Sequence, residues 1–166
     1  VLVSGNFYNL QPAYYPIQPK VDVMITEMEH SLFRQPYFYR YSAGFADGKP
    51  MIIAYWSIAC KPCIQELNAI NDALEDWRKE ADFTVVAVST DDARLKAPAK
   101  NMATSRGWEF TCLFDDKQVM RRAMNVTVTP QAFVVDGEGN IVYSHTGYTP
   151  GSEEELFQKI LELKKK

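Results

Sequence analysis

Residues 51–63, MIIAYWSIACKPC, decide the fold because an apolar run is followed at once by two cysteines. The run from Met51 to Tyr55 is continuously apolar, which is typical of a β-strand buried on both faces of a sheet. From about residue 61 to 79, apolar side chains recur at helical spacing, on a stripe of Ile64, Leu67, Ile70, Leu74 and Trp77. The sequence therefore predicts a strand-to-helix junction with Cys60 and Cys63 at the start of the helix.

Strands and helices continue to alternate along the rest of the chain. Further strands are predicted at 83–89, 110–114, 131–135 and 141–145, the last two joined by the turn sequence Asp136-Gly137-Glu138-Gly139-Asn140. One helix is predicted from a cap at Asp91 or Asp92 to about Arg106, with Pro98 either kinking it or delaying its start. A short helix is predicted from a cap at Asp115 or Asp116 to Met124. A last helix is predicted after Ser152, with Glu155 in the capping-box position. This order predicts an α/β fold with a central mixed sheet covered by helices on both faces.

The first part of the chain differs in composition from the rest. Residues 1–45 are rich in Tyr, Phe and Pro, as in Tyr14-Tyr15-Pro16 and Pro36-Tyr37-Phe38-Tyr39. We interpret residues 1–45 as an N-terminal extension that packs on the main domain and residues 46–166 as that domain.

Composition and charge exclude several classes of protein. The chain has 166 residues, 46% of them hydrophobic, and a net charge of -3, which favours neither a nucleic-acid partner nor a strongly acidic substrate. No apolar run approaches the roughly 20 residues needed to cross a bilayer, and no secretory signal pattern opens the chain. We expect either a cytosolic protein or one from which a targeting segment is absent in this chain.

The Cys60-Lys61-Pro62-Cys63 motif predicts thiol–disulfide chemistry. A helix N-terminus stabilises a thiolate, which is the reactive form of cysteine. Pro62 suits the first helical turn, where its missing N–H costs nothing, and Lys61 adds a nearby positive charge. We expect Cys60 to be the exposed nucleophile that attacks a substrate disulfide, and Cys63 to be the buried thiol that resolves the mixed disulfide.

Two other interpretations of the cysteine pair stay open at this point. A Cys-x-x-Cys pair can be half of a zinc site, for which the further ligands would have to come from Cys112, His30 and His145, all isolated in the sequence. The two cysteines can also be an inert buried pair. We predict no metal, and for Cys112 we favour a packed, inert thiol, with a regulatory cysteine as the alternative.

Residues from about 45 to 166 resemble the thioredoxin superfamily, in particular its TlpA/ResA-like thiol–disulfide oxidoreductases. Three segments carry the resemblance: residues 48–63, from Gly48-Lys49-Pro50 to the cysteine motif, residues 128–136, VTPQAFVVD, and the hairpin residues 139–142 followed by Gly147. The interval between Cys63 and Pro130 holds an additional helix and strand, at about 91–114, similar to an insertion in the TlpA-like and peroxiredoxin-like branches. The resemblance thus implies a thioredoxin-like fold with an inserted αβ element and an N-terminal extension.

The same resemblance assigns roles to individual residues. It makes Pro130 the family's cis-proline, beside the cysteine pair, and gives the Thr129 backbone a strand-like contact with an extended substrate. It assigns proton exchange with Cys63 to Glu66, because plain thioredoxins place a buried Asp where this chain has Ala54. A solvated helix Glu is the alternative for Glu66. The residues expected to bind substrate are Trp56, Lys61, Pro62, Thr129 and Pro130. Trp56 is also expected to be a packing residue that forms the floor of the site.

This chain departs from the family pattern at two positions. Ala59 stands where a bulky residue often precedes the first cysteine, and Leu67 stands where a Pro often follows the Glu. Neither change removes a reacting group, but both alter the surface that a substrate would meet.

The resemblance implies an extracytoplasmic, for example periplasmic, disulfide reductase. It would need no cofactor beyond its redox-active disulfide Cys60–Cys63, would reduce oxidised protein thiols and would receive electrons from a membrane thiol–disulfide carrier. Two alternative functions stay open. A peroxiredoxin-like thiol peroxidase is favoured by the Ser57-Ile58-Ala59-Cys60 pattern but disfavoured by Ile53, where that family has Pro. A non-catalytic thioredoxin-like binding module is the other alternative.

Overall fold

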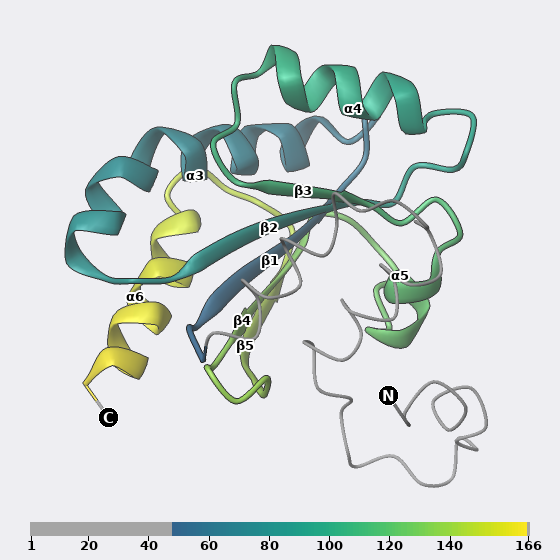
Figure 1. Ribbon diagram of the computed structural model, residues 1–166. Coiled ribbons are helices and arrows are strands. Elements are labelled where there is room, and N and C mark those ends of the chain that lie inside the picture. The colour runs from purple at the N-terminus through teal and green to yellow at the C-terminus, as the bar shows by residue number, and fades with distance from the viewer. Residues whose placement is uncertain (1–47, 166) are drawn as a thin grey trace, which may run out of the picture.

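A five-stranded sheet forms the centre of residues 48–165, the part of the chain that the computed structural model describes (Figure 1). The strands are β1 Met51–Trp56, β2 Thr84–Ser89, β3 Thr111–Phe114, β4 Gln131–Val135 and β5 Ile141–Thr146. Their order is β3-β2-β1-β4-β5, with β1, β2 and β3 parallel and β4 antiparallel to both β1 and β5. The predicted mixed sheet is confirmed. The proposed extension, residues 1–45, lies outside the described residues.

The helices cover the two faces of the sheet unequally. They are α3 Lys61–Glu80, α4 Lys96–Ser105, α5 Val119–Ala123 and α6 Glu153–Lys164. In β1, Ile52, Ala54 and Trp56 pack in the same cluster as residues of α3, α4 and α6, while the alternate residues of the strand join a second cluster that includes Met120 of α5. Every residue of β1 is buried, as its apolar run predicted.

Helix α3 begins and packs as the apolar stripe predicts, with one shift. Leu67, Ile70, Leu74 and Trp77 are buried, but Ile64 is only half-buried. The buried stripe begins instead at Cys63, which lies one turn before Leu67. The second cysteine is thus part of the hydrophobic core.

Helix α4 begins later than its predicted start at Asp91 or Asp92. The Asp92 carboxylate accepts hydrogen bonds from the backbone N–H groups of Arg94 and Leu95, which closes a separate turn before the helix. Pro98 is the third residue of α4, where its missing N–H costs no helical hydrogen bond. The proline therefore fits a delayed start and does not kink the helix.

The two remaining helix starts were predicted in part: Asp115 does bind the start of α5, and α6 begins just after Ser152. Helix α5 begins at Val119, and Asp115 reaches it from four residues away by accepting from the Val119 and Arg121 N–H groups. Ser152 makes no side-chain cap on α6; its hydroxyl accepts from the Thr149 N–H instead, so the capping box with Glu155 does not form. Asp115 thus binds N–H groups of the first turn of α5, whereas Ser152 binds the turn that precedes α6.

The inserted element contributes an edge of the sheet. Helix α4 and strand β3 lie between β2 and α5 in the chain, and β3 pairs in parallel with β2. Figure 1 shows α4 lying beside β3 at that edge.

Within residues 48–165, no helix combines the length and the apolar character that crossing a bilayer requires.

Substitution Phe157→Ala should lower the free energy of unfolding by about 3–5 kcal/mol, because Phe157 joins α6 to α3. Its ring is buried and stacks on Trp77 with centroids 4.7 Å apart. Chemical denaturation measures the loss. Val142→Thr on the exposed side of β5 is the control and should change stability by less than about 0.5 kcal/mol. A similar small change for Phe157→Ala would contradict this account of the core.

Candidate active site

Cys60 and Cys63 form a disulfide at the N-terminus of α3, with Cα atoms 5.3 Å apart. The two residues differ in exposure, since Cys60 is half-buried and Cys63 has no exposed surface. A bimolecular exchange with another protein therefore has access to the Cys60 sulfur, whereas Cys63 is reachable only from within the protein. The predicted difference in exposure between the two cysteines is thus confirmed.

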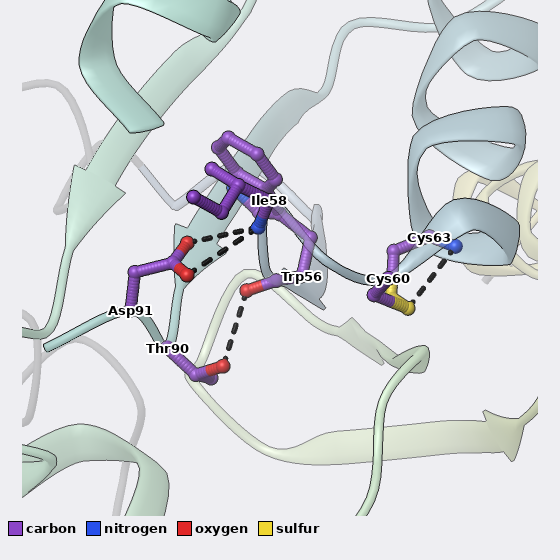
Figure 2. The surroundings of a disulfide bond; sticks show 6 residues. All are labelled: Trp56, Ile58, Cys60, Cys63, Thr90 and Asp91. Atoms are coloured by element: carbon purple, nitrogen blue, oxygen red, sulfur yellow. Dashed lines mark hydrogen bonds between the residues drawn. A yellow bond between two sulfur atoms is a disulfide. The ribbon is translucent and has the colours of Figure 1, made fainter. Parts of the chain in front are cut away.

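The start of α3 provides a favourable environment for a negative sulfur. Cys60 is the N-cap residue, and its Sγ accepts from the Cys63 N–H at 3.3 Å (Figure 2). The first turn contains no acidic side chain. Pro62 lies in this turn, where its missing N–H costs no helical hydrogen bond. The helix dipole and this N–H group would stabilise a Cys60 thiolate once the disulfide is reduced. Lys61 and Pro62 are exposed beside the cysteines.

The segment before Cys60 is held by residues that follow the neighbouring strand β2. The buried Asp91 carboxylate accepts from the Ile58 N–H, at 3.0 Å to Oδ2 and 3.4 Å to Oδ1 (Figure 2). Ser89 Oγ donates to the same Oδ2 at 2.8 Å, and Thr90 Oγ1 donates to the Trp56 carbonyl at 3.2 Å. These bonds tie the Cys60 loop to the end of β2.

The sequence indicated Asp91 only as a helix start, and its anchoring role was not predicted. A signal was available, because the carboxyl ends of two parallel strands meet at the same edge of a sheet. Asp91 comes just after β2, and Cys60 comes just after β1, which pairs in parallel with β2.

Thr129 and Pro130 approach the same edge from the other neighbour of β1. Their peptide bond is cis, and Pro130 directly precedes Gln131, which pairs with Tyr55 near the end of β1. Thr129 is half-buried, and Val128 is exposed. The loop before β4 therefore lies beside the end of β1 from which the Cys60 loop leaves.

Trp56 does not suit the substrate-binding role predicted for it. Its side chain has no exposed surface and packs edge-to-face against Trp108, with ring centroids 5.0 Å apart. A fully buried indole offers no surface to a substrate, so Trp56 supports the loop from beneath. The packing role expected for Trp56 is confirmed, but the sequence does not show that Trp108, in the inserted element, covers this ring.

Glu66 lies one turn after Cys63 and is fully buried, which excludes the alternative of a solvated helix residue. Its Oε1 lies 2.8 Å from Nε2 of His145 on β5, a residue to which the sequence assigned no role. The alternation of β5 places the side chains of Tyr143 and His145 toward the helices, so the inward position could have been predicted. The pairing of His145 with α3 could not.

The remaining metal-ligand candidates do not assemble into a site. Cys60 and Cys63 are bonded to each other, and His145 is hydrogen-bonded to Glu66. Among residues 48–165, no cluster of three or more His, Cys, Asp or Glu side chains is placed to hold a metal ion. His30, the other candidate, lies outside the described residues.

Cys112 on β3 lies apart from the disulfide. Its thiol is half-buried and donates to the Phe110 carbonyl at 3.8 Å. Burial raises the pKa of the Cys112 thiol to about 12. Because the thiolate is the nucleophile, Cys112 has the properties of a packed, unreactive residue.

A comparison with protein families agrees with this geometry. The model described as Redoxin matches residues 35–161. The chain belongs to the Redoxin family. Its solved relatives include an uncharacterized thioredoxin-like protein from Porphyromonas gingivalis, 46% identical, with a TM-score of 0.64 over 72% of this chain and 78% of that one.

Two further relatives place this Redoxin protein in the TlpA/ResA-like branch. The putative thiol:disulfide interchange protein DsbE from Chlorobium tepidum is 28% identical, with a TM-score of 0.64 over 73% of this chain and 84% of that one. The thiol-disulfide oxidoreductase ResA of Bacillus anthracis is 26% identical over 95 residues, 57% of this chain and 53% of that protein. The chain thus spans about half the length of the curated relatives it matches. The resemblance to the thioredoxin superfamily and the predicted thioredoxin-like fold are confirmed.

Substitution Asp91→Ala should lower the free energy of unfolding by about 1–3 kcal/mol, because it leaves the Ile58 N–H and the Ser89 hydroxyl without their acceptor. Asp91→Asn keeps one acceptor oxygen and should lose less. Urea denaturation compares both with Asp72→Ala, an exposed change on α3 expected to stay within about 0.5 kcal/mol. Equal stability of Asp91→Ala and Asp72→Ala would show that the loop is not held in this way.

Native alkylation of the reduced protein should modify Cys60 and spare Cys112. At mildly alkaline pH the Cys112 thiol stays protonated, since its pKa is raised to about 12. Mass spectrometry after a short iodoacetamide pulse measures the modification, and the same pulse in guanidinium chloride is the control that should label Cys112. Labelling of Cys112 at the rate of Cys60 under native conditions would favour the regulatory alternative.

Proposed function

We propose that this protein is a thiol–disulfide oxidoreductase that exchanges electrons between its Cys60/Cys63 dithiol and protein disulfides, acting as a reductase. One observation carries the proposal: a half-exposed Cys60 is bonded to a fully buried Cys63 at the N-terminus of a helix. The names of its relatives ResA and DsbE support the same chemistry.

The reaction follows from the difference between the two sulfurs. In the reduced protein, the Cys60 thiolate attacks a substrate disulfide, forms a mixed disulfide and releases one substrate thiolate. Cys63 loses its proton and attacks the Cys60 sulfur, which forms the Cys60–Cys63 disulfide and releases the second substrate thiolate. The substrate gains two electrons, and the dithiol loses them.

Substrate contact is proposed for the exposed or half-exposed groups around Cys60. Lys61 and Pro62 flank the nucleophile, and Thr129 lies in the loop that approaches the end of β1. The Thr129 backbone would bind an extended substrate segment by strand-like addition, with Pro130 fixing the loop. The Pro130 carbonyl already accepts from the Gly147 N–H, which ties the loop to the end of β5.

Glu66 is proposed to exchange a proton with Cys63. Both side chains are fully buried and lie one helical turn apart, so a proton leaving Cys63 has no direct path to water. A carboxylate one helical turn from a thiol can act as its general base.

The wider setting is part of the proposal. Reduction of protein disulfides consumes two electrons per cycle, which we assign to a membrane thiol–disulfide carrier in an extracytoplasmic compartment such as the periplasm. The support is the likeness to the TlpA/ResA-like branch. No cofactor beyond the disulfide itself is needed for this chemistry.

Insulin reduction in the presence of a dithiol reductant tests the proposal directly. The protein should accelerate precipitation of the insulin B chain, and Cys60→Ser should abolish the effect, whereas Cys112→Ser should leave it unchanged. Cys63→Ser should accumulate a mixed disulfide with the substrate, visible on a non-reducing gel, because the resolving step is lost.

The same preparations distinguish the alternative functions. Fast peroxide consumption without insulin reduction would indicate a thiol peroxidase. Absence of both activities, with partner binding unaffected by Cys60→Ser, would indicate a non-catalytic binding module.

A further inference from the structure

We propose that His145 is a positioning residue for Glu66, holding one carboxylate oxygen so that the other is available to take the proton of Cys63. The inference rests on the proposed function and extends it to a residue on a different element. It starts from an unusual observation, namely two titratable side chains paired inside the protein next to a redox-active disulfide.

Both side chains of the pair are largely shielded from solvent. The side chains of His145 and Glu66 are 13% and 1% exposed, and His145 Nε2 lies 2.8 Å from Glu66 Oε1. Such a contact in a water-poor site restricts the carboxylate more than a surface pair would. The rotation of Glu66 about its last bonds is therefore set by β5 as well as by α3.

Each partner keeps one polar atom without a hydrogen bond. Glu66 Oε2 and His145 Nδ1 are both buried and unpartnered. An unsatisfied buried oxygen is costly, and a proton delivered to it removes part of that cost. Oε2 is thus the atom of this pair best suited to receive a proton.

The sheet explains why the pair forms at this place. His145 on β5 pairs with Ala132 on β4, and Ala132 pairs with Ala54 on β1. Side chains directly opposite each other on neighbouring strands share a face, so these three residues form a row beneath α3. Two alanines in that row leave room for a long side chain from the helix to reach the histidine.

Other ionisable groups surround the pair on the elements packed against it. Cys63 lies on α3, Tyr143 lies two residues before His145 with ring centroids 6.1 Å apart, and Tyr148 follows β5. Burial, together with hydrogen bonding to Glu153 and the charge of Glu66, raises the pKa of Tyr148 to about 12, so this phenol stays neutral. Glu155 and Lys159 of α6 contact Tyr143 and not the pair. Among the described groups, Glu66 and His145 are therefore the pair that we propose for the proton transfer from Cys63: Glu66 accepts the proton, and His145 positions Glu66.

The proton and electron movements balance. Cys63–SH transfers its proton to Oε2 of the Glu66 carboxylate, and the resulting thiolate attacks Cys60 Sγ. The bond between Cys60 and the substrate sulfur breaks, and its electron pair leaves with the substrate thiolate. In the reverse direction Glu66 returns the proton to Cys63 as the disulfide opens.

Stopped-flow reaction of the reduced protein with the aromatic disulfide DTNB separates the two steps. Attack by Cys60 releases the first coloured thiolate at a rate proportional to DTNB concentration. Attack by Cys63 releases the second at a rate independent of that concentration. In His145→Ala, the second phase should slow by about ten- to a hundredfold at neutral pH and recover as the pH rises, while the first phase stays unchanged.

Conservative and matched variants keep the test specific. His145→Gln carries an amide N–H that can donate to Glu66 without titrating, so it should restore most of the second phase. Ser144→Ala, exposed on the other side of β5, should change neither phase. The double variant Glu66→Gln/His145→Ala should be no slower than Glu66→Gln alone, because His145 acts through Glu66.

Three results would overturn the proposal: an unchanged second phase in His145→Ala, an equal slowing of both phases, or no recovery in His145→Gln. Failure of the proposed function is a different result. A wild-type protein that releases no coloured thiolate would refute the oxidoreductase activity itself, before any variant is compared.

Discussion

Strand β1 is hydrogen-bonded on both sides, to β2 and to β4, and every one of its residues is buried. Because both edges and both faces of the strand are occupied, the point at which it ends is fixed in space. The chain leaves the strand after Trp56, and four residues later Cys60 caps α3. The position of the Cys60 sulfur thus depends on a strand that has little freedom to move.

The neighbours of β1 also deliver the groups that complete the site. Strand β2 ends in Ser89, Thr90 and Asp91, whose hydrogen bonds hold the Cys60 loop from one side. Strand β4 begins just after Pro130 and brings the Thr129-Pro130 loop from the other side. The site is therefore assembled from three adjacent strands, although its two sulfurs come from one short motif.

A buried carboxylate on α3 meets a histidine on β5 one helical turn from Cys63. In the row Ala54–Ala132–His145, strands β1 and β4 contribute only alanines. The buried carboxyl group comes from α3 instead. Its partner comes from an edge strand far along the sequence. The closing hairpin therefore contacts α3 one helical turn from Cys63.

The sequence by itself determined the strand-to-helix junction, the five strands, the inserted αβ element and the unequal exposure of Cys60 and Cys63. These follow from local apolar periodicity and from the physical needs of a thiolate. Only the tertiary structure decided that Trp56 is covered by Trp108, that Asp91 anchors the Cys60 loop and that Glu66 meets His145. Each of these depends on segments distant in sequence packing together, and no local pattern specifies which distant side chain fills a given space.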